Sequence, residues 1–129
     1  SRYSKAALER ALALARDFQS ELLVLSVMDA PPGFGQEAPQ VATEILGGLR
    51  KLVQDAARKA ASQGVECRTW VWEGSVYRSI VELARMEQAG FIVLGSHGRT
   101  GLKRLLMGSV TERVIGHAGC PVLVVKLKR

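Results

Sequence analysis

The sequence predicts an α/β fold built as an open parallel sheet with helices on both faces. Segments with helical periodicity alternate along the chain with short apolar segments that are typical of strands. Such an alternation implies parallel βαβ units, whose crossover helices cover both faces of the sheet. The chain has 129 residues, of which 47% are hydrophobic. This is enough for one domain with its own core, spanning residues 1–129.

Four segments carry apolar residues at every third or fourth position, which indicates amphipathic helices. Gly64 follows the second segment and ends it, because glycine readily takes the left-handed conformation that closes a helix. Ser75 is a candidate N-cap for the third segment. The expected helices cover residues 4–19, 41–62, 76–89 and about 109–118.

Four shorter segments predict strands. Residues 21–29 and 90–95 are almost continuously apolar, as in strands buried on both faces. Residues 65–72 alternate between apolar and polar side chains and indicate a strand nearer the sheet edge, and residues 121–127 close the chain as an apolar strand. Residues 30–40 hold three of the four prolines and two glycines, so we expect a loop there.

Charge and composition limit the classes of partner. The net charge of +6, from 18 basic and 12 acidic side chains, permits an anionic ligand. The basic residues are scattered and aromatic residues make up only 5%, so we expect no nucleic-acid surface. No apolar run reaches the roughly 18 residues of a membrane span, and no signal peptide is visible. Cys67 and Cys120 form no CxxC or metal-ligand cluster, so we expect reduced thiols in a cytoplasmic protein.

Six of the thirteen glycines lie between residues 94 and 126. Gly95 and Gly98 come where strand 90–95 ends, and Gly108 precedes the helix at 109–118. Glycine lets the backbone approach a ligand closely, and the free amides at a helix N-terminus attract anions. Ligands of open parallel sheets bind beyond the carboxyl ends of the strands. The spacing therefore predicts an anion-binding cradle at this edge.

A purely structural interpretation of these residues stays open. Ser109 and Glu112 have the spacing of a capping box, in which Ser109 caps the helix and Glu112 returns to the Ser109 amide. Gly95 and Gly98 would then only make a turn. The two interpretations are compatible, because a capped helix still presents amides to a ligand.

Other polar residues in this stretch add little chemistry. Arg99, Lys103 and Arg104 either neutralise phosphate charge or form an ordinary exposed face, and the sequence favours neither. His97 has no Ser/His/Asp or Cys/His arrangement around it, so we expect it to be solvated rather than catalytic.

The segment GSHGRTGLKRLLMGSVTERV…CPVLVV closely resembles the universal stress protein family. The nucleotide-binding subgroup of that family is marked by Gly-x2-Gly-x9-Gly-(Ser/Thr), which Gly95, Gly98, Gly108 and Ser109 match without a gap. The resemblance implies a Rossmann-like fold of the adenine nucleotide alpha hydrolase-like type, with strand order 3-2-1-4-5. It also implies ATP or AMP as ligand, with Mg²⁺ or Mn²⁺ held through the phosphates rather than by a protein cage.

The resemblance also implies roles for single residues. Gly95 and Gly98 would lie along the ribose and phosphates, while Gly108, Ser109 and the amide of Val110 would hold the phosphates.

The strand LLVLSVMD resembles the second strand of the family, although Ser26 stands where the family commonly has His. By the same resemblance, Val27 would sit against the adenine, with Leu94 close by.

The family opens with a strand whose closing turn carries an Asp that contacts the nucleotide. Ser1 resembles the last residue of that turn, so the first family strand is expected to be missing from this chain. In the family's order that strand is central, and strands 21–29 and 90–95 could not pair without it, which would orphan backbone groups in the core. We therefore expect that residues before Ser1 exist in the natural protein.

Together these features predict an adenine-nucleotide-binding regulatory protein of the stress response, without enzymatic activity. An apolar edge strand invites pairing with another chain, so we expect a homodimer through residues 121–127. A related adenylating enzyme would need a Ser-Gly-Gly-x-Asp-Ser loop, which the sequence lacks. A nucleotide-free dimerisation or scaffold domain, as part of a larger tandem or transporter protein, remains the alternative.

Overall fold

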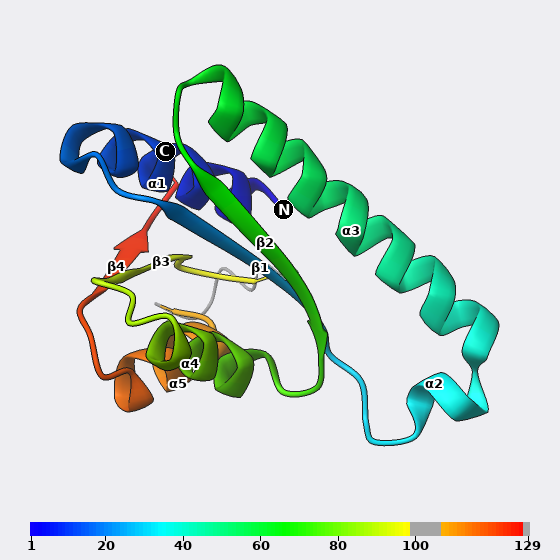
Figure 1. Cartoon of the computed structure of the whole chain (residues 1–129). Helices are drawn as coiled ribbons and strands as arrows, with labels where there is room; N and C mark the ends of the chain where they lie inside the picture. The colour runs from blue at the N-terminus through cyan, green and yellow to red at the C-terminus, as the bar shows by residue number, and fades with distance from the viewer. Residues whose placement is uncertain (99–106, 128–129) are drawn as a thin grey trace.

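The computed structural model describes residues 1–98 and 107–127, which form an α/β fold with parallel strands. The elements in chain order are α1 (Arg2–Phe18), β1 (Leu22–Met28), α2 (Phe34–Glu37), α3 (Pro39–Ser62), β2 (Cys67–Glu73), α4 (Val76–Met86), β3 (Ile92–Gly95), α5 (Ser109–His117) and β4 (Val122–Val125). Figure 1 shows α1 and α3 on one side of the strands and α4 and α5 on the other.

The strands are joined as two parallel pairs. β1 pairs with β2 from Leu22↔Cys67 onward, and β3 pairs with β4 from Ile92↔Val122 onward. Within the part of the chain that the structure describes, no ladder joins β1 to β3. The predicted parallel strands are thus confirmed, but they form two two-stranded sheets instead of one open sheet.

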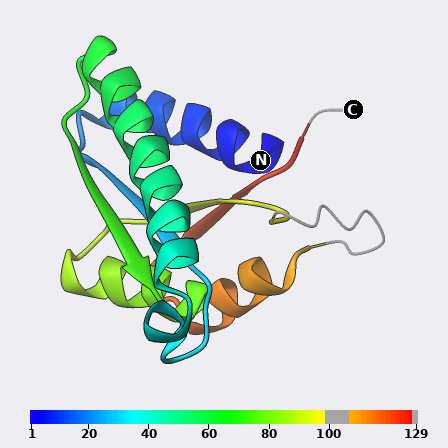
Figure 2. The ribbon, with the colours of Figure 1, turned by 90° about the vertical axis from the view of Figure 1, so that its right-hand side faces the viewer.

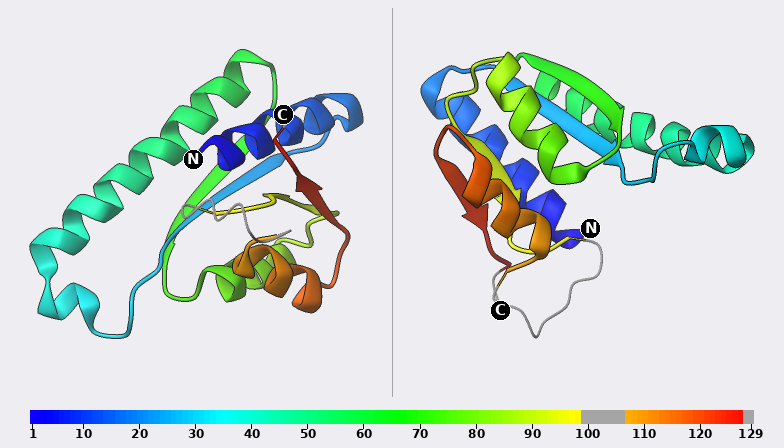
Figure 3. Two further views of the ribbon diagram at one scale, coloured as in Figure 1. Left: turned by 180° about the vertical axis from the view of Figure 1, so that it is seen from behind. Right: turned by 90° about the horizontal axis from the view of Figure 1, so that it is seen from below.

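Helices cover both faces, as predicted. α3 packs on β1 and β2, and α1 packs on β3 and β4. These two helices lie on the same side, whereas α4 and α5 pack against each other on the opposite side (Figure 2). α3 also extends beyond the strands, with the short α2 at its start (Figure 3). This overhang agrees with the exposure of Val41 and Leu52 on α3.

The core is formed mainly under α1 and α3. Leu12 and Ala15 of α1 meet Ala60 of α3 and Val65, and all four are buried. A second cluster joins Met28 at the end of β1 to Ala42 and Leu49 of α3. Because these residues repeat at helical spacing in α1 and α3, burial of one apolar face explains why the helices form where the sequence predicts them.

One predicted loop is wrong. Residues 30–40 contain α2 and the start of α3, which begins at Pro39. Proline suits the first turn of a helix, where its missing amide costs nothing, and burial of Ala42 holds that turn on the core. Gly64 follows the end of α3 with φ of +72°, as expected for a residue that closes a helix.

Candidate functional site

The two ends of the glycine motif meet where β3 ends and α5 begins. Gly95 is the last residue of β3, and Gly108 is the N-cap of α5. The Gly108 amide donates a hydrogen bond to the Ser96 carbonyl at 2.7 Å. The structure therefore brings Gly95 and Gly98 beside Gly108, with Ser109 and Val110 directly after it. The basic residues Arg99, Lys103 and Arg104, together with Gly101, lie outside the described residues.

Close packing against α1 requires glycine at position 95. A Cβ at this position would lie 2.8 Å from Tyr3 Cβ and 3.0 Å from the Tyr3 carbonyl carbon and oxygen. The first turn of α1 thus rests directly on the end of β3. The Tyr3 ring also contacts the His97 ring, with centroids 5.1 Å apart. The close approach at Gly95 is to this chain's own first helix, and its role along a ligand stays a prediction.

Gly98 and Gly108 differ in their surroundings. A Cβ on Gly108 would lie 3.3 Å from His97 Cα and 3.5 Å from the Gly98 nitrogen, so little room exists for a side chain. A Cβ on Gly98 would meet nothing within 4 Å, and this residue is exposed. No described residue occupies the space beside Gly98, while Gly108 serves close packing of the two backbone segments.

The N-terminus of α5 lacks a side-chain cap. The helix begins at Ser109 and its N-cap is Gly108, with no side-chain hydrogen bond at the cap. The predicted capping box of Ser109 and Glu112 is therefore wrong, because Ser109 is already the first helical residue. Among the described residues, no side chain caps this helix end, so its positive dipole and the amides of Ser109 and Val110 can serve another acceptor.

Sequence reasoning missed two buried polar residues of this site. Thr111 is 4% exposed, and its hydroxyl donates to the Gly95 carbonyl at 2.9 Å. Ser96 is 2% exposed, and its hydroxyl forms a hydrogen bond of 2.9 Å with His97 Nδ1. A signal for Thr111 exists in the sequence: it lies three residues before Val114, on the apolar face of the helix, where a polar side chain needs a partner.

The two residues expected near an adenine lie in different sheets. Leu94 is half-buried in β3 and pairs with Val124. Val27 is half-buried in β1, where it pairs with Trp72. Leu94 is thus adjacent to the glycine motif, whereas Val27 belongs to the other pair of strands.

The described residues hold no group of three His, Cys, Asp or Glu side chains that could bind a metal ion. Cys67 and Cys120 are free thiols, both half-buried. Burial, assisted by the negative charge of Glu21, raises the pKa of the Cys67 thiol. Within residues 1–98 and 107–127, no helix is both long and apolar enough to cross a membrane.

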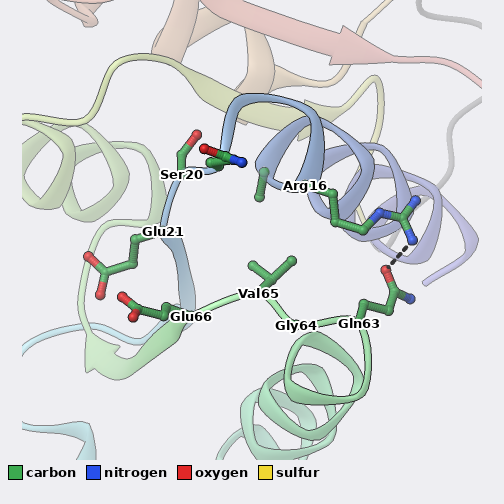
Figure 4. Close-up of a pocket in the computed structure, with 9 residues that line it drawn as sticks. Arg16, Ser20, Glu21, Gln63, Gly64, Val65 and Glu66 are labelled. Atoms are coloured by element: carbon green, nitrogen blue, oxygen red, sulfur yellow. Dashed lines mark hydrogen bonds between the residues drawn. The ribbon is translucent and has the colours of Figure 1, made fainter.

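A hollow of about 400 Å³ opens at the opposite, amino-terminal end of β1 and β2 (Figure 4). Arg16 Nη1 donates to Gln63 Oε1 across it at 3.0 Å. Glu21, at its rim, accepts two hydrogen bonds from Arg68 at 2.8 and 2.9 Å, which lower the pKa of the Glu21 carboxyl. The lining residues are Ala15, Arg16, Gln19, Ser20, Glu21, Gln63, Gly64, Val65 and Glu66.

The fold and the glycine turn define a class: parallel α/β proteins whose candidate ligand site lies at the carboxyl ends of the strands. The profile of the universal stress protein family matches residues 1–126, and the chain belongs to that family. It is 40% identical over 124 residues to Universal stress protein MJ0531 of Methanocaldococcus jannaschii, covering 93% of this chain and 73% of that protein. It is 32% identical over 142 residues to Universal stress protein YxiE of Bacillus subtilis, covering 95% of this chain and 90% of that protein.

Solved structures agree with this membership. The structure of MJ0577, another Methanocaldococcus jannaschii protein, superposes with a TM-score of 0.92 at 29% identity and covers 100% of this chain and 91% of that one. Two family structures with the same fold, both 23% identical to this chain, were solved with nucleotides. One is a universal stress protein in complex with cAMP, at a TM-score of 0.73, covering 98% of this chain and 89% of that one. The other is the Archaeoglobus fulgidus protein in complex with dAMP, at a TM-score of 0.68, covering 98% and 90%.

Proposed function

We propose that this protein is a cytoplasmic, adenine-nucleotide-binding regulator of the stress response, and that it acts through binding rather than catalysis. ATP or AMP binds at the glycine motif, and the bound nucleotide changes the conformation or partner choice of the protein. Family membership supports this proposal, as do the adenine nucleotides cAMP and dAMP bound by two members.

The observation that carries the proposal is the uncapped N-terminus of α5 beside the open space at Gly98. The amides of Ser109 and Val110 lie at the positive end of the helix dipole, where an anion gains most. The Gly108–Ser96 hydrogen bond keeps this helix end next to the strand end. In this arrangement, the amides of Ser109 and Val110 would bind the phosphates, and the sugar would lie along the backbone at Gly98.

The hydrogen-bond donors at this site also indicate how a metal ion would be held. Backbone amides bind phosphate oxygens but cannot ligate a cation, and the described residues offer no acidic cluster that could. We therefore propose that Mg²⁺ or Mn²⁺ enters with the phosphates of the nucleotide. In this proposal the adenine lies against Val27 and Leu94, which contribute apolar surface.

One further parallel strand between β1 and β3 would complete the site. The edges of β1 and β3 that face each other have no ladder partner among the described residues. The first six residues of β1 are only half-buried, although all but Ser26 are apolar. A buried backbone group without a partner costs about 1–3 kcal/mol. We propose that residues before Ser1 supply this strand. Protein isolated from its natural source with an intact mass of 14.0 kDa, the mass of this chain alone, would reject that proposal.

We also propose a homodimer through residues 121–127. β4 pairs only with β3 among the described strands, so its outer edge is available for another chain. Leu123 in this strand is 40% exposed, which is unusual for leucine in a strand of a parallel sheet. Sedimentation at micromolar concentration is expected to show a dimer, and a monomer would contradict the proposal.

The second candidate, a nucleotide-free dimerisation or scaffold domain, has one specific observation in its favour. The contact between Gly95 and Tyr3 explains that glycine without any ligand. The described residues give no such explanation for Gly98 or for the N-terminus of α5, so nucleotide binding accounts for more of the motif.

Calorimetric titration of the full-length protein distinguishes the two functions. We expect one site per chain for ATP with Mg²⁺, with a dissociation constant of roughly 1–100 μM. AMP should compete for the same site, and GTP should bind less tightly, since the nucleotides bound by the two family members both carry adenine. Absence of heat with both ATP and AMP would reject nucleotide binding and favour the scaffold function. Tighter binding of GTP than of ATP would reject the adenine assignment.

A further inference from the structure

Two buried hydrogen bonds fasten the start of α5 to the end of β3. The Thr111 hydroxyl donates to the Gly95 carbonyl at 2.9 Å, and the Gly108 amide donates to the Ser96 carbonyl at 2.7 Å. We call this pair of hydrogen bonds the clasp. Thr111 and Ser96 are 4% and 2% exposed, while Gly95 and Gly108 are half-buried, so water has limited access to both bonds.

The clasp links two segments that ordinary secondary structure does not link. β3 continues its ladder to β4 through the Ser96 amide, which donates to the Val125 carbonyl at 3.0 Å. The carbonyls of Gly95 and Ser96 both accept from the start of α5 instead. The last carbonyl of the strand and the carbonyl that follows it thus hold the helix.

Thr111 supplies the one side-chain donor in the clasp. It is the third residue of α5, one residue after Val110, and therefore belongs to the helical turn that presents the candidate phosphate-binding amides. Val114 lies on the same face and is completely buried. Val114 anchors the helix by apolar contact, which fixes its distance from the core but resists sliding and rotation weakly. A hydrogen bond is directional and resists both.

We propose that Thr111 is a positioning residue for the nucleotide site. Its hydroxyl fixes the direction of the Ser109 and Val110 amides relative to the open space at Gly98, without touching the ligand itself. This inference rests on the proposed function, because a positioned donor matters only if an anion binds there. Donors held in place before binding raise affinity by removing the entropy cost of ordering them.

Three variants of the full-length protein separate positioning from general stability. Thr111→Val keeps the shape of the side chain but removes the donor, and Thr111→Ser keeps the donor. Val114→Ala is the matched control, since it weakens the same helix face without changing the clasp. For each, the affinity for ATP with Mg²⁺ is measured by calorimetry and the stability by urea unfolding.

Thr111→Val is expected to weaken ATP binding by at least about tenfold, whereas Thr111→Ser stays within about threefold of the unchanged protein. Val114→Ala is expected to lower the urea midpoint at least as much as Thr111→Val does. Its dissociation constant for ATP should nevertheless stay within about threefold of that of the unchanged protein. Equal ATP affinity of Thr111→Val and the unchanged protein would overturn the proposal. So would an equal loss of affinity in Val114→Ala, because the effect would then follow stability alone.

A readout without ligand keeps the two proposals distinguishable. If the unchanged protein binds no nucleotide, the proposed function fails, and amide hydrogen exchange then tests the clasp by itself. The Gly108 amide should exchange at least about tenfold faster in Thr111→Val than in Val114→Ala. Equal exchange rates in these two variants would show that Thr111 does not hold the helix, and would overturn its positioning role.

Discussion

The two ends of the strands contrast in shape and in charge. At the amino end, the hollow between α1 and α3 is large, but the C-terminal caps of both helices, Gln19 and Gln63, lie on its wall. Helix C-termini carry partial negative charge, and the carboxylates of Glu21 and Glu66 offset the charges of Arg16 and Arg68, so no net positive charge attracts a phosphate there. At the carboxyl end, the glycine motif offers helix amides without a side-chain cap. The candidate anion site therefore lies at the helix amides of the carboxyl end rather than in the hollow.

The two ends also differ in how their polar groups are satisfied. At the amino end, Arg16 is bonded to Gln63 and Arg68 to Glu21, so these side chains have partners within the protein. At the carboxyl end, the Thr111 hydroxyl and the Ser96 carbonyl have partners within the clasp, while no described side chain caps the helix end that follows Gly108. Substitutions at each end should therefore act on different quantities: stability at the amino end, and both stability and binding at the carboxyl end.

The largest effect on stability is expected for Gly95→Ala. The new Cβ would lie 2.8 Å from Tyr3 Cβ, so α1 or β3 must shift. Such overpacking costs about 1–3 kcal/mol. The matched control is Gly98→Ala, whose Cβ meets nothing within 4 Å and should change the free energy of unfolding by less than about 0.5 kcal/mol. Urea unfolding measures both, and equal losses in the two variants would contradict the contact of α1 with Gly95.

A smaller, pH-dependent effect is expected for Arg68→Ala at the amino end. Hydrogen bonds from Arg68 lower the pKa of Glu21 below its usual value of about 4.5. A carboxyl with a lowered pKa stabilises the fold above its unfolded pKa, and this stabilisation is lost as pH falls through the folded pKa. The difference in urea midpoint between Arg68→Ala and the unchanged protein should therefore be present at neutral pH and shrink below pH 4.5. Both partners of this pair are accessible to solvent, so the effect should be modest.

Glu21→Gln is the control for that experiment. It removes the same carboxylate and should show a similarly reduced dependence of the urea midpoint on pH. A difference between Arg68→Ala and the unchanged protein that persists unchanged at pH 3 would mean that the Glu21–Arg68 pair does not cause it.

Local features of the fold could be predicted from the sequence. The alternation of helices and strands was confirmed because each apolar face repeats with the period of its element, as Leu12 and Ala15 do in α1. The helix start at Pro39 was missed because prolines and glycines nearby resembled a loop, while burial of Ala42 depends on contacts with β1. The division of the strands into two pairs agrees with the expectation that strands 21–29 and 90–95 do not pair with each other.

The candidate site was predictable in its motif but not in its contacts. The spacing of Gly95, Gly98 and Gly108 indicated two facing backbone segments, and the structure brings them together. The contact of Gly95 with Tyr3 could not be predicted, because the two residues are far apart in the sequence and meet only through the packing of α1 on β3. The capping box was predicted wrongly because the spacing of Ser109 and Glu112 does not reveal that Gly108 already occupies the cap position.

The central claim is that nucleotide binds at the carboxyl end and not in the hollow. The most direct test is calorimetric titration of ATP with Mg²⁺ into the full-length protein, Gly108→Val and Gln63→Ala. A valine side chain at Gly108 would press on His97 and Gly98, whose atoms lie 3.3 and 3.5 Å from the added Cβ, and should displace the helix amides. We predict that Gly108→Val loses binding by at least about a hundredfold and that Gln63→Ala binds like the unchanged protein. Equal binding by Gly108→Val, or loss of binding in Gln63→Ala alone, would contradict this account.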